Sequence, residues 1–309
     1  MSQVHLSNYQ ARDFEVVDYK TYLLEDTGLT FRGPAPKSFN SGEYFSCIGA
    51  AQTFGCFCEQ PYPELLSASL GLPALNLGYG GAGPEFFLKQ EKLHTYLNRS
   101  KFVILQVMSG RSQSNSLYEC GGLEYVTRRS DGHKMSAKQA FMDLYSNAPF
   151  FERFQNSRIV RRFGGKVARP KIQALVNEMS DAWVESYIQL IGNISVPVVL
   201  LWFSKREPEY DENYQSVGKL FGAYPQLVNR EMVDKVVAHT EKYVHCVTNR
   251  GAPQILRSRF TGDPISVETA LDREDLASAP WSTNHYYPTP EMHQDVSKQL
   301  VEVCKPLLQ

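Results

Sequence analysis

Five short apolar runs, separated by segments with helical periodicity, most constrain the fold of this chain. The runs cover residues 44–48, 75–78, 102–108, 196–203 and 243–248. Continuous apolar runs of this length are typical of strands that are buried on both faces of a parallel sheet. Strands that alternate with helices place those helices on both faces of the sheet. The sequence therefore predicts a three-layer α/β/α fold around a five-stranded parallel, flavodoxin-like sheet.

The segments between the runs define the remaining organisation. Helices are expected at 61–70, 84–98, 230–239 and 290–307, the last one capped by Thr289. A long helix is expected to start at Pro170, because apolar residues recur at three- and four-residue steps from Ile172 to Ile191. Residues 109–170, with one helix at 136–145, are rich in glycine, serine and arginine and predict an inserted cap region. Residues 1–40 form a lead-in, and residues 41–309 form the α/β domain.

Composition excludes several classes of protein. Of the 309 residues, 42% are hydrophobic and 21% are charged, which argues against general disorder. The formal net charge of −1 gives no reason to expect a nucleic-acid partner or a general affinity for anionic membranes. The longest apolar stretch is far shorter than the ~20 residues that span a bilayer, and no apolar signal segment opens the chain. We expect a soluble, cytoplasmic protein without a membrane span, with six reduced cysteines and no metal site.

Polar and glycine-rich segments follow the predicted strands. Because ligands of open α/β sheets bind beyond the carboxyl ends of the strands, these segments are the candidate site. The first strand is followed by Gly49-Ala50-Ala51-Gln52-Thr53 and the second ends in Asn76-Leu77-Gly78-Tyr79-Gly80-Gly81. The later segments and the closing helix contribute Arg111, Asn115, Arg206, Arg250 and His293.

This layout resembles that of the SGNH (GDSL-like) hydrolase superfamily. In that family the first strand ends in Gly-Asp-Ser-x-Thr, the second in Asn-x-Gly-x-x-Gly and the third in Gly-x-Asn-Asp, and the last helix begins near Asp-x-x-His. The likeness extends from about residue 44 to 308 and is best in the first two blocks and the final helix. Overall, the chain more closely resembles an uncharacterised bacterial family that reads Gly-Gly-Thr-Glu-Thr-Phe-Gly in the first block.

Two departures from the SGNH pattern change the expected chemistry. Ala51 stands at the position of the nucleophilic serine, and Ala50 stands at that of the preceding aspartate. Alanine has no group that attacks a carbonyl, so the usual serine route is not expected. The final block lacks the aspartate that would orient His293, although Glu291 is close in sequence.

The remaining site residues keep two interpretations open. The resemblance implies that His293 is a general base, with His285 in reserve, and that amides near Gly80 and Gly81 bind an oxyanion or phosphate. Gln52 would hydrogen-bond a substrate, and Asn115 matches the third block loosely. Thr53 and Cys56 are replacement nucleophiles if a histidine lies nearby; otherwise they fill the space between the first helix and the sheet.

Three arginines that follow predicted strands favour an anionic ligand. Arg111, Arg206 and Arg250 each follow a predicted strand, and arginine binds phosphate, sulfate and carboxylate bidentately. The alternative is that each pairs locally, as Arg206 would with Glu207. A basic segment from Arg153 to Lys171 is either a solvated face or a lid over the same edge.

Three functions are compatible with these residues. The first is SGNH-like group transfer, in which an acyl or related group passes from an anionic activated donor to a carbohydrate or lipid precursor. The acceptor hydroxyl then serves as nucleophile, His293 as base and the arginines as the donor site. The second is a non-catalytic binding protein on a degenerate hydrolase scaffold. The third is an ester hydrolase that uses Cys56 or Thr53. The sequence leaves the cofactor unknown.

Overall fold

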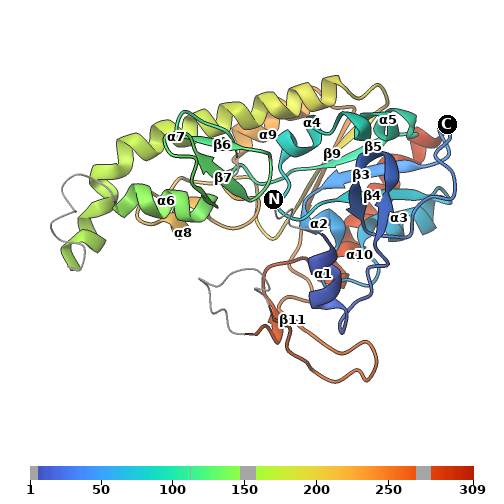
Figure 1. Ribbon diagram of the computed structural model, residues 1–309. Helices are drawn as coiled ribbons and strands as arrows, with labels where there is room; N and C mark the ends of the chain where they lie inside the picture. Colours follow the sequence, from blue (N-terminus) through green and yellow to red (C-terminus); the bar gives the residue numbers. More distant parts are fainter. Residues whose placement is uncertain (1–5, 112, 147–157, 269–279) are drawn as a thin grey trace.

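A five-stranded parallel sheet forms the centre of the computed structural model, which describes residues 6–111, 113–146, 158–268 and 280–309 (Figure 1). In spatial order the strands are β10 (Lys242–Val247), β9 (Val198–Ser204), β5 (Val103–Gln106), β3 (Phe45–Gly49) and β4 (Ala74–Gly78). Every neighbouring pair is parallel. The predicted α/β/α architecture is confirmed, and each predicted run forms one strand with small shifts at its ends.

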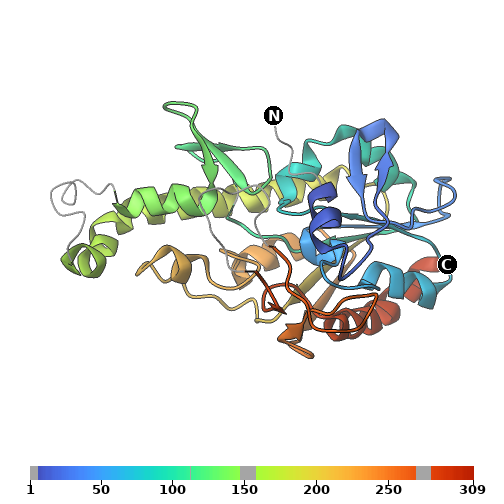
Figure 2. The ribbon, with the colours of Figure 1, turned by 60° about the horizontal axis from the view of Figure 1, so that its bottom comes forward.

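Helices cover both faces of this sheet (Figure 2). One face packs against α4 (Pro84–Leu88), α5 (Glu91–Arg99), α7 (Arg158–Gly192) and α9 (Arg230–Val237), and the other against α3 (Tyr62–Leu70) and α10 (Pro290–Cys304). Trp183 and Tyr187 of α7 are fully buried in the first core. Phe203 and Val296 belong to the second core. Two apolar layers therefore enclose the sheet, as its continuous hydrophobic strands require.

Two helix predictions need correction. The helix expected at 84–98 is divided into α4 and α5, which are separated at Lys89 and Gln90. The long helix α7 begins at Arg158 and contains Pro170 in its interior, so Pro170 does not start it. Proline removes one backbone hydrogen bond and favours the first helical turn, yet this helix continues through Pro170.

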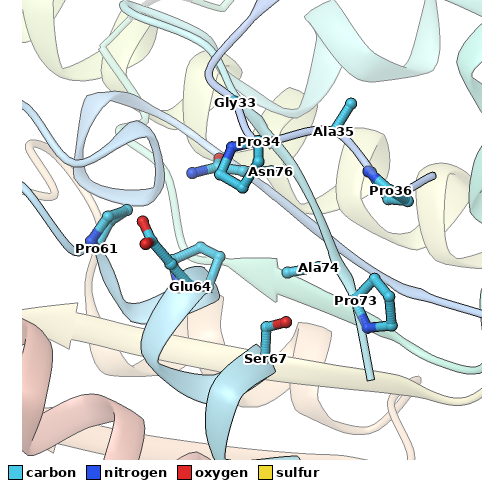
Figure 3. A pocket seen from close by; sticks show the side chains of 11 residues that line it. Gly33, Pro34, Ala35, Pro36, Pro61, Glu64, Ser67, Pro73, Ala74 and Asn76 are labelled. Atoms are coloured by element: carbon cyan, nitrogen blue, oxygen red, sulfur yellow. The ribbon is translucent and has the colours of Figure 1, made fainter. Parts of the chain in front are cut away.

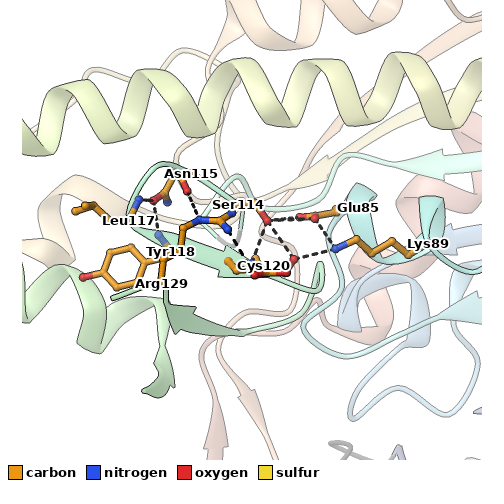
Figure 4. A network of polar contacts seen from close by, with 9 residues as sticks. Glu85, Lys89, Ser114, Asn115, Leu117, Tyr118, Cys120 and Arg129 are labelled. Atoms are coloured by element: carbon orange, nitrogen blue, oxygen red, sulfur yellow. Dashed lines mark hydrogen bonds and ion pairs between the residues drawn. The ribbon is translucent and has the colours of Figure 1, made fainter. Parts of the chain in front are cut away.

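The region between β5 and α7 contains a small antiparallel sheet that the sequence patterns did not predict. Its strands are β6 (Tyr118–Cys120), β7 (Tyr125–Arg128) and β8 (Lys134–Ser136), and α6 (Ala137–Ser146) follows. Helix α8 (Val217–Phe221) packs against α6. A polar network joins this sheet to α4, where Lys89 donates to the carbonyl of Cys120 at 3.1 Å and pairs with Glu85 at 2.7 Å (Figure 4).

The N-terminal segment packs on the α/β domain. Helix α1 (Leu6–Asp13) precedes a two-stranded sheet of β1 (Tyr22–Leu24) and β2 (Leu29–Phe31), which a 3-10 turn (Glu25–Thr27) connects. A second pair, β11 (Gln254–Ile255) and β12 (Thr283–Asn284), leads to the last helix. Within the described ranges, no helix combines the length and apolar character that crossing a membrane requires.

Candidate functional site

The turn after β3 is fixed by a buried side chain from the neighbouring strand. The Oε1 atom of Gln106 accepts hydrogen bonds from the backbone N–H of Ala50 at 3.0 Å and from the hydroxyl of Thr53 at 2.7 Å. A Cβ atom at Gly49 would collide with both side chains, so only glycine allows this approach. The short helix α2 (Ala51–Phe54) therefore starts in a rigid, fully packed turn.

Thr53 takes part in this packing. It is fully buried, and its oxygen also lies 3.0 Å from the hydroxyl of Tyr62. The Thr53 hydroxyl thus donates to Gln106 and lies next to the Tyr62 hydroxyl. Among the described residues, no histidine ring nitrogen lies within hydrogen-bond distance of it. This environment is that of a structural threonine.

Gln52, by contrast, belongs to a group of five side chains that we call the rim cluster. Its members are Gln52, Arg111, Glu124, Tyr224 and Tyr286. They meet where β3 and β5 end side by side, which is the point where the strand order reverses and ligands of such sheets bind. Gln52 is 2% exposed, and its Oε1 atom has no hydrogen-bond partner among the described residues. Its amide group also lies against the hydroxyl of Tyr286.

Arg111 supplies the positive charge of the rim cluster. Its guanidinium lies 4.0 Å from the carboxylate of Glu124, and the two side chains are 21% and 37% exposed. Tyr286 is 37% exposed, but desolvation of its hydroxyl raises its pKa, and the charge of Arg111 opposes that shift. Burial also raises the pKa of Tyr224, again opposed by Arg111. Both phenols are therefore neutral hydrogen-bonding groups beside a cation.

Arg206 and Arg250 do not join Arg111. The Arg206 guanidinium donates to the carbonyls of Ala223 at 3.1 Å and Val228 at 2.7 Å and lies over the Trp202 ring at 5.1 Å. Burial lowers the pKa of Arg206 to about 10. Arg250 pairs with Asp295 at 2.7 Å on α10. The expected convergence of three arginines is thus corrected: two of them hold loops and helix ends in place.

His293 lies in the core on the other face of the sheet. It is fully buried, its ring packs against Phe203 at 5.3 Å, and its Nδ1 atom accepts from the backbone N–H of Tyr62 at 3.1 Å. Burial lowers the pKa of His293 to about 3, and the nearby charge of Arg32 adds to this. The structure thus does not bring His293 together with Gln52 or Arg111. His285 is exposed, and its carbonyl accepts from Lys205 at 2.9 Å.

The glycine loop after β4 is covered rather than open. A Cβ atom at Gly80 would lie 2.6 Å from the ring of Tyr9 in α1. Gly81 has a positive φ of 76°, and a Cβ atom there would lie 3.3 Å from Glu124. Tyr9 also contacts Phe54, with ring centroids 5.6 Å apart, and hydrogen-bonds Tyr287. These glycines let α1 and Glu124 approach the loop closely.

Asn115 caps a turn in the inserted region (Figure 4). Its Oδ1 atom accepts from the backbone N–H groups of Leu117 at 3.0 Å and Tyr118 at 2.9 Å. An asparagine that binds two successive amides in this way is a turn-forming residue. The loose match of Asn115 to the third SGNH block therefore corresponds to local structure.

The cysteines next to α2 are buried. Burial raises the pKa of the Cys56 thiol, and it raises the pKa of Cys58 to about 12, so both are neutral thiols near pH 7. Cys56 has no accessible surface. Within the described ranges, no group of three or more His, Cys, Asp or Glu side chains is placed to hold a metal ion. Arg153 of the basic segment lies outside the described residues.

The loop before α10, which contains the reserve candidate His285, contributes to the site through residues next to that histidine. Asn284 is fully buried, and its Oδ1 atom accepts from the backbone N–H groups of Tyr286 at 3.1 Å and Tyr287 at 2.8 Å. It thereby positions Tyr286 in the rim cluster. Asn284 and Tyr287 are three positions apart, as are the Asp and the His of the Asp-x-x-His segment in the SGNH pattern. They also lie just before α10, which begins at Pro290, as that segment lies near the start of the last helix. This spacing was a usable signal, although the segment contains a tyrosine where the pattern has its histidine.

A proline-lined pocket lies away from the rim cluster, between the edge strand β4 and α3 (Figure 3). Its cavity volume is about 90 Å³, and its lining includes Pro34, Pro61, Glu64 and Pro73. Asn76 also lines it, but its amide is engaged in a hydrogen bond to the carbonyl of Thr53 at 3.1 Å. None of the lining residues belongs to the rim cluster.

Comparison with known proteins gives one family and several distant structures. Residues 7–308 match the family model described as Domain of unknown function (DUF6473). No curated protein matches the sequence. A carbohydrate esterase family 2 enzyme from Corynascus thermopiles (Myceliophthora fergusii) is similar at 11% identity, over 91% of this chain and 70% of that chain, with a TM-score of 0.39.

Two further solved structures are similar at the same distance. The α/β hydrolase LAE5 from the metagenome of Lake Arreo, Spain, has 11% identity over 87% of this chain and 98% of that chain, with a TM-score of 0.39. The lipase Lip_vut3 from a goat rumen metagenome has 10% identity over 86% of this chain and 99% of that chain, with a TM-score of 0.40.

Proposed function

The chain belongs to the DUF6473 family, and we propose that it binds a small anionic, hydroxylated ligand at the rim cluster without catalysing serine-type ester hydrolysis. The observation that carries this proposal is the placement of Arg111. It is a partly exposed cation at the switch point of the sheet, and its ion-pair partner among the described residues, Glu124, is 4.0 Å away. The Arg111 guanidinium would bind an incoming phosphate or sulfate group through two parallel hydrogen bonds.

The groups around Arg111 fit the remainder of such a ligand. The unpartnered carbonyl of Gln52 would accept a hydrogen bond from a hydroxyl group, and its burial makes that bond valuable. The rings of Tyr224 and Tyr286 offer apolar faces, with ring centroids 6.4 Å apart, and Tyr286 also offers its neutral hydroxyl group. The Tyr224 hydroxyl already accepts from Gln106 at 2.9 Å and donates to the carbonyl of Val107 at 3.3 Å. The ligand class that uses all four groups is a sugar that carries a phosphate or sulfate group.

Serine-type hydrolysis lacks its reacting groups here. The methyl group of Ala51 occupies the nucleophile position, and the neutral imidazole of His293 is enclosed in the opposite core. The thiol alternative, Cys56, is buried with a raised pKa. These observations favour binding, the second of the functions considered from the sequence, over hydrolysis.

Group transfer is a second candidate, and Glu124 favours it. This carboxylate is 37% exposed and lies beside Gly81 and Arg111. A carboxylate in that place would accept the proton of an acceptor hydroxyl as the hydroxyl oxygen bonds to the acyl carbon of an activated donor that Arg111 holds. The bond between that acyl carbon and the donor's leaving group breaks, and the leaving group departs with its electron pair. In this version of the function Glu124, rather than His293, is the base.

Ligand-dependent thermal stability tests the proposal. We expect phosphorylated or sulfated sugars to raise the melting temperature and the matching unmodified sugars to leave it unchanged. Arg111→Gln should abolish the shift. Arg250→Gln is the matched control, because Arg250 also follows a strand but pairs with Asp295. If no anionic sugar stabilises the protein, or Arg111→Gln keeps the full shift, the binding proposal fails.

Glu124→Gln separates the two candidate functions. A binding protein should show no turnover with acyl-CoA or nucleotide-sugar donors and sugar acceptors, analysed by mass spectrometry. A transferase should form product, lose it in Glu124→Gln and keep its ligand-induced thermal shift. Product formation that survives Glu124→Gln would remove Glu124 as the base.

A further inference from the structure

Gln113 is a buried glutamine whose side-chain amide is unpaired. The residue is 1% exposed, and neither its Nε2 nor its Oε1 atom has a hydrogen-bond partner among the described residues. A buried amide without hydrogen bonds is unfavourable, so native proteins contain few of them. Gln106, by comparison, uses both ends of its amide in hydrogen bonds. The state of the Gln113 amide favours a role in binding over a role in the fold.

The backbone on both sides of Gln113 is held in place. Before it, the N–H of Gly110 donates to the carbonyl of Gln226 at 2.8 Å. After it, the hydroxyl of Ser114 accepts from the N–H of Cys120 at 3.0 Å (Figure 4). The unpaired amide therefore extends from a fixed segment, as a preorganised binding group does.

Gln113 lies next to the rim cluster. A Cβ atom at Gly83 would come within 3.2 Å of the Nε2 atom of Gln113, and one at Gly81 would come within 3.3 Å of Glu124. Arg111, which pairs with Glu124, precedes Gln113 by two residues. The loop after β4 thus contacts both Gln113 and the Arg111–Glu124 pair. Because Arg111 is partly exposed and Gln113 is buried, Gln113 lies deeper in the protein.

The chemistry of a free carboxamide suits a pair of hydroxyl groups. The NH₂ group of Gln113 can donate to one hydroxyl oxygen, while its carbonyl accepts the proton of the neighbouring hydroxyl. The charge of a phosphate or sulfate group is better met by the guanidinium of Arg111. A neutral amide beside that cation would therefore distinguish anionic ligands by their hydroxyl groups.

We propose that Gln113 is a specificity-determining residue of the rim cluster, where its amide binds two adjacent hydroxyl groups of the ligand. The inference rests on the proposed function, because Arg111 holds the anionic group of the same ligand. It narrows the ligand class to phosphorylated or sulfated sugars that have a free pair of adjacent hydroxyl groups. A ligand that lacks one of them leaves a buried polar group unpaired and is rejected.

Calorimetric titration with the full chain tests this inference. The probes are inorganic phosphate, ribose 5-phosphate, glucose 6-phosphate, mannose 6-phosphate and the monodeoxy analogues of the sugar phosphate that binds most tightly. We expect at least one monodeoxy analogue to bind about tenfold or more weakly than its parent sugar. Gln113→Met should remove this discrimination and leave the affinity for inorganic phosphate unchanged.

The matched control is Tyr243→Phe, which removes another buried hydrogen-bonding atom without a partner among the described residues, on β10. It should keep the discrimination. Gln113→Met should unfold at the same temperature as the unchanged protein or a higher one, because it removes an unpaired polar group from the interior. A lower melting temperature together with equally weakened binding of all probes would assign the amide to the fold and overturn the inference.

The deoxy analogues also test the unchanged protein directly. If they bind as tightly as the parent sugar phosphate, or if Gln113→Met keeps the discrimination, Gln113 does not read hydroxyl groups. Neither result affects the proposed function as long as sugar phosphates bind and Arg111→Gln weakens their binding. If no sugar phosphate binds, the proposed function and this inference are both wrong.

Discussion

The backbone N–H of Ala50 donates a hydrogen bond to the Oε1 atom of Gln106 at 3.0 Å, so a side chain of β5 holds the turn that follows β3. The same oxygen accepts from Thr53. In the SGNH sequence pattern that the chain resembles, the corresponding residues contain the nucleophilic serine. In this chain the turn is a closed hydrogen-bonded corner, and the adjacent Gln52 is the side chain with an unused acceptor.

Removing the Gln106 amide, which holds the turn after β3, should destabilise the protein. Gln106→Leu leaves the Ala50 N–H and the Thr53 hydroxyl without their acceptor in a buried site, and we expect a loss of about 3 kcal/mol in the free energy of unfolding. Urea denaturation measures it. Gln189→Leu is the control, because Gln189 is exposed and contacts Glu185 on the helix surface. Equal losses in the two variants would contradict the role given to Gln106.

Restoring a serine should not restore hydrolysis. Ala51→Ser places a hydroxyl at the nucleophile position, but the imidazole of His293 lies in the opposite core and Tyr287 precedes α10 at the histidine spacing. Without a base the hydroxyl stays a weak nucleophile. We expect no hydrolysis of 4-nitrophenyl acetate above that of the unchanged protein. A burst of nitrophenol from Ala51→Ser would show that a base reaches residue 51.

His293 should make stability depend on pH in the acidic range. Its folded-state pKa of about 3 lies below the ordinary value of ~6.5, so the unfolded chain takes up the proton first as the pH falls. The stabilising contribution is therefore complete above pH ~6.5 and decreases toward pH 3.

His293→Gln, which keeps an acceptor for the Tyr62 N–H, removes this dependence. The stability advantage of the unchanged protein over the variant should shrink by about 2 kcal/mol between pH 7 and pH 5, measured by urea denaturation. An advantage that is constant with pH would mean that the imidazole is protonated in the folded state.

The sheet was predictable because its signal is local. Each strand is an uninterrupted apolar run, and the alternation with helices sets the parallel topology. The start of α10 was predictable for the same reason, since Thr289 caps the helix through the N–H of Met292. The small sheet of β6, β7 and β8 escaped prediction because its strands are short and carry polar residues.

The candidate site depends on long-range contacts that no local pattern encodes. The resemblance to the SGNH pattern implies a site role for His293, and Met292 in the apolar stripe of the same helix means that His293 need not belong to the core. In the structure α10 packs beside α3 and against β10, so Met292 and His293 are both buried.

The contact between Gly80 and Tyr9 leads to the last prediction. Gly80→Ala places a methyl group 2.6 Å from the tyrosine ring, so α1 has to move, and we expect a loss of about 1–3 kcal/mol in the free energy of unfolding. Gly121→Ala should cost much less, because nothing lies within 4 Å of a Cβ atom at that position.

A double-mutant cycle identifies the cause of the Gly80→Ala loss. If the clash with Tyr9 is responsible, Gly80→Ala should cost clearly less in a Tyr9→Ala background than in the unchanged protein, and the coupling free energy should exceed about 0.5 kcal/mol. Additive losses would show that the glycine loop requires Gly80 for its own backbone and that α1 covers the loop without close contact.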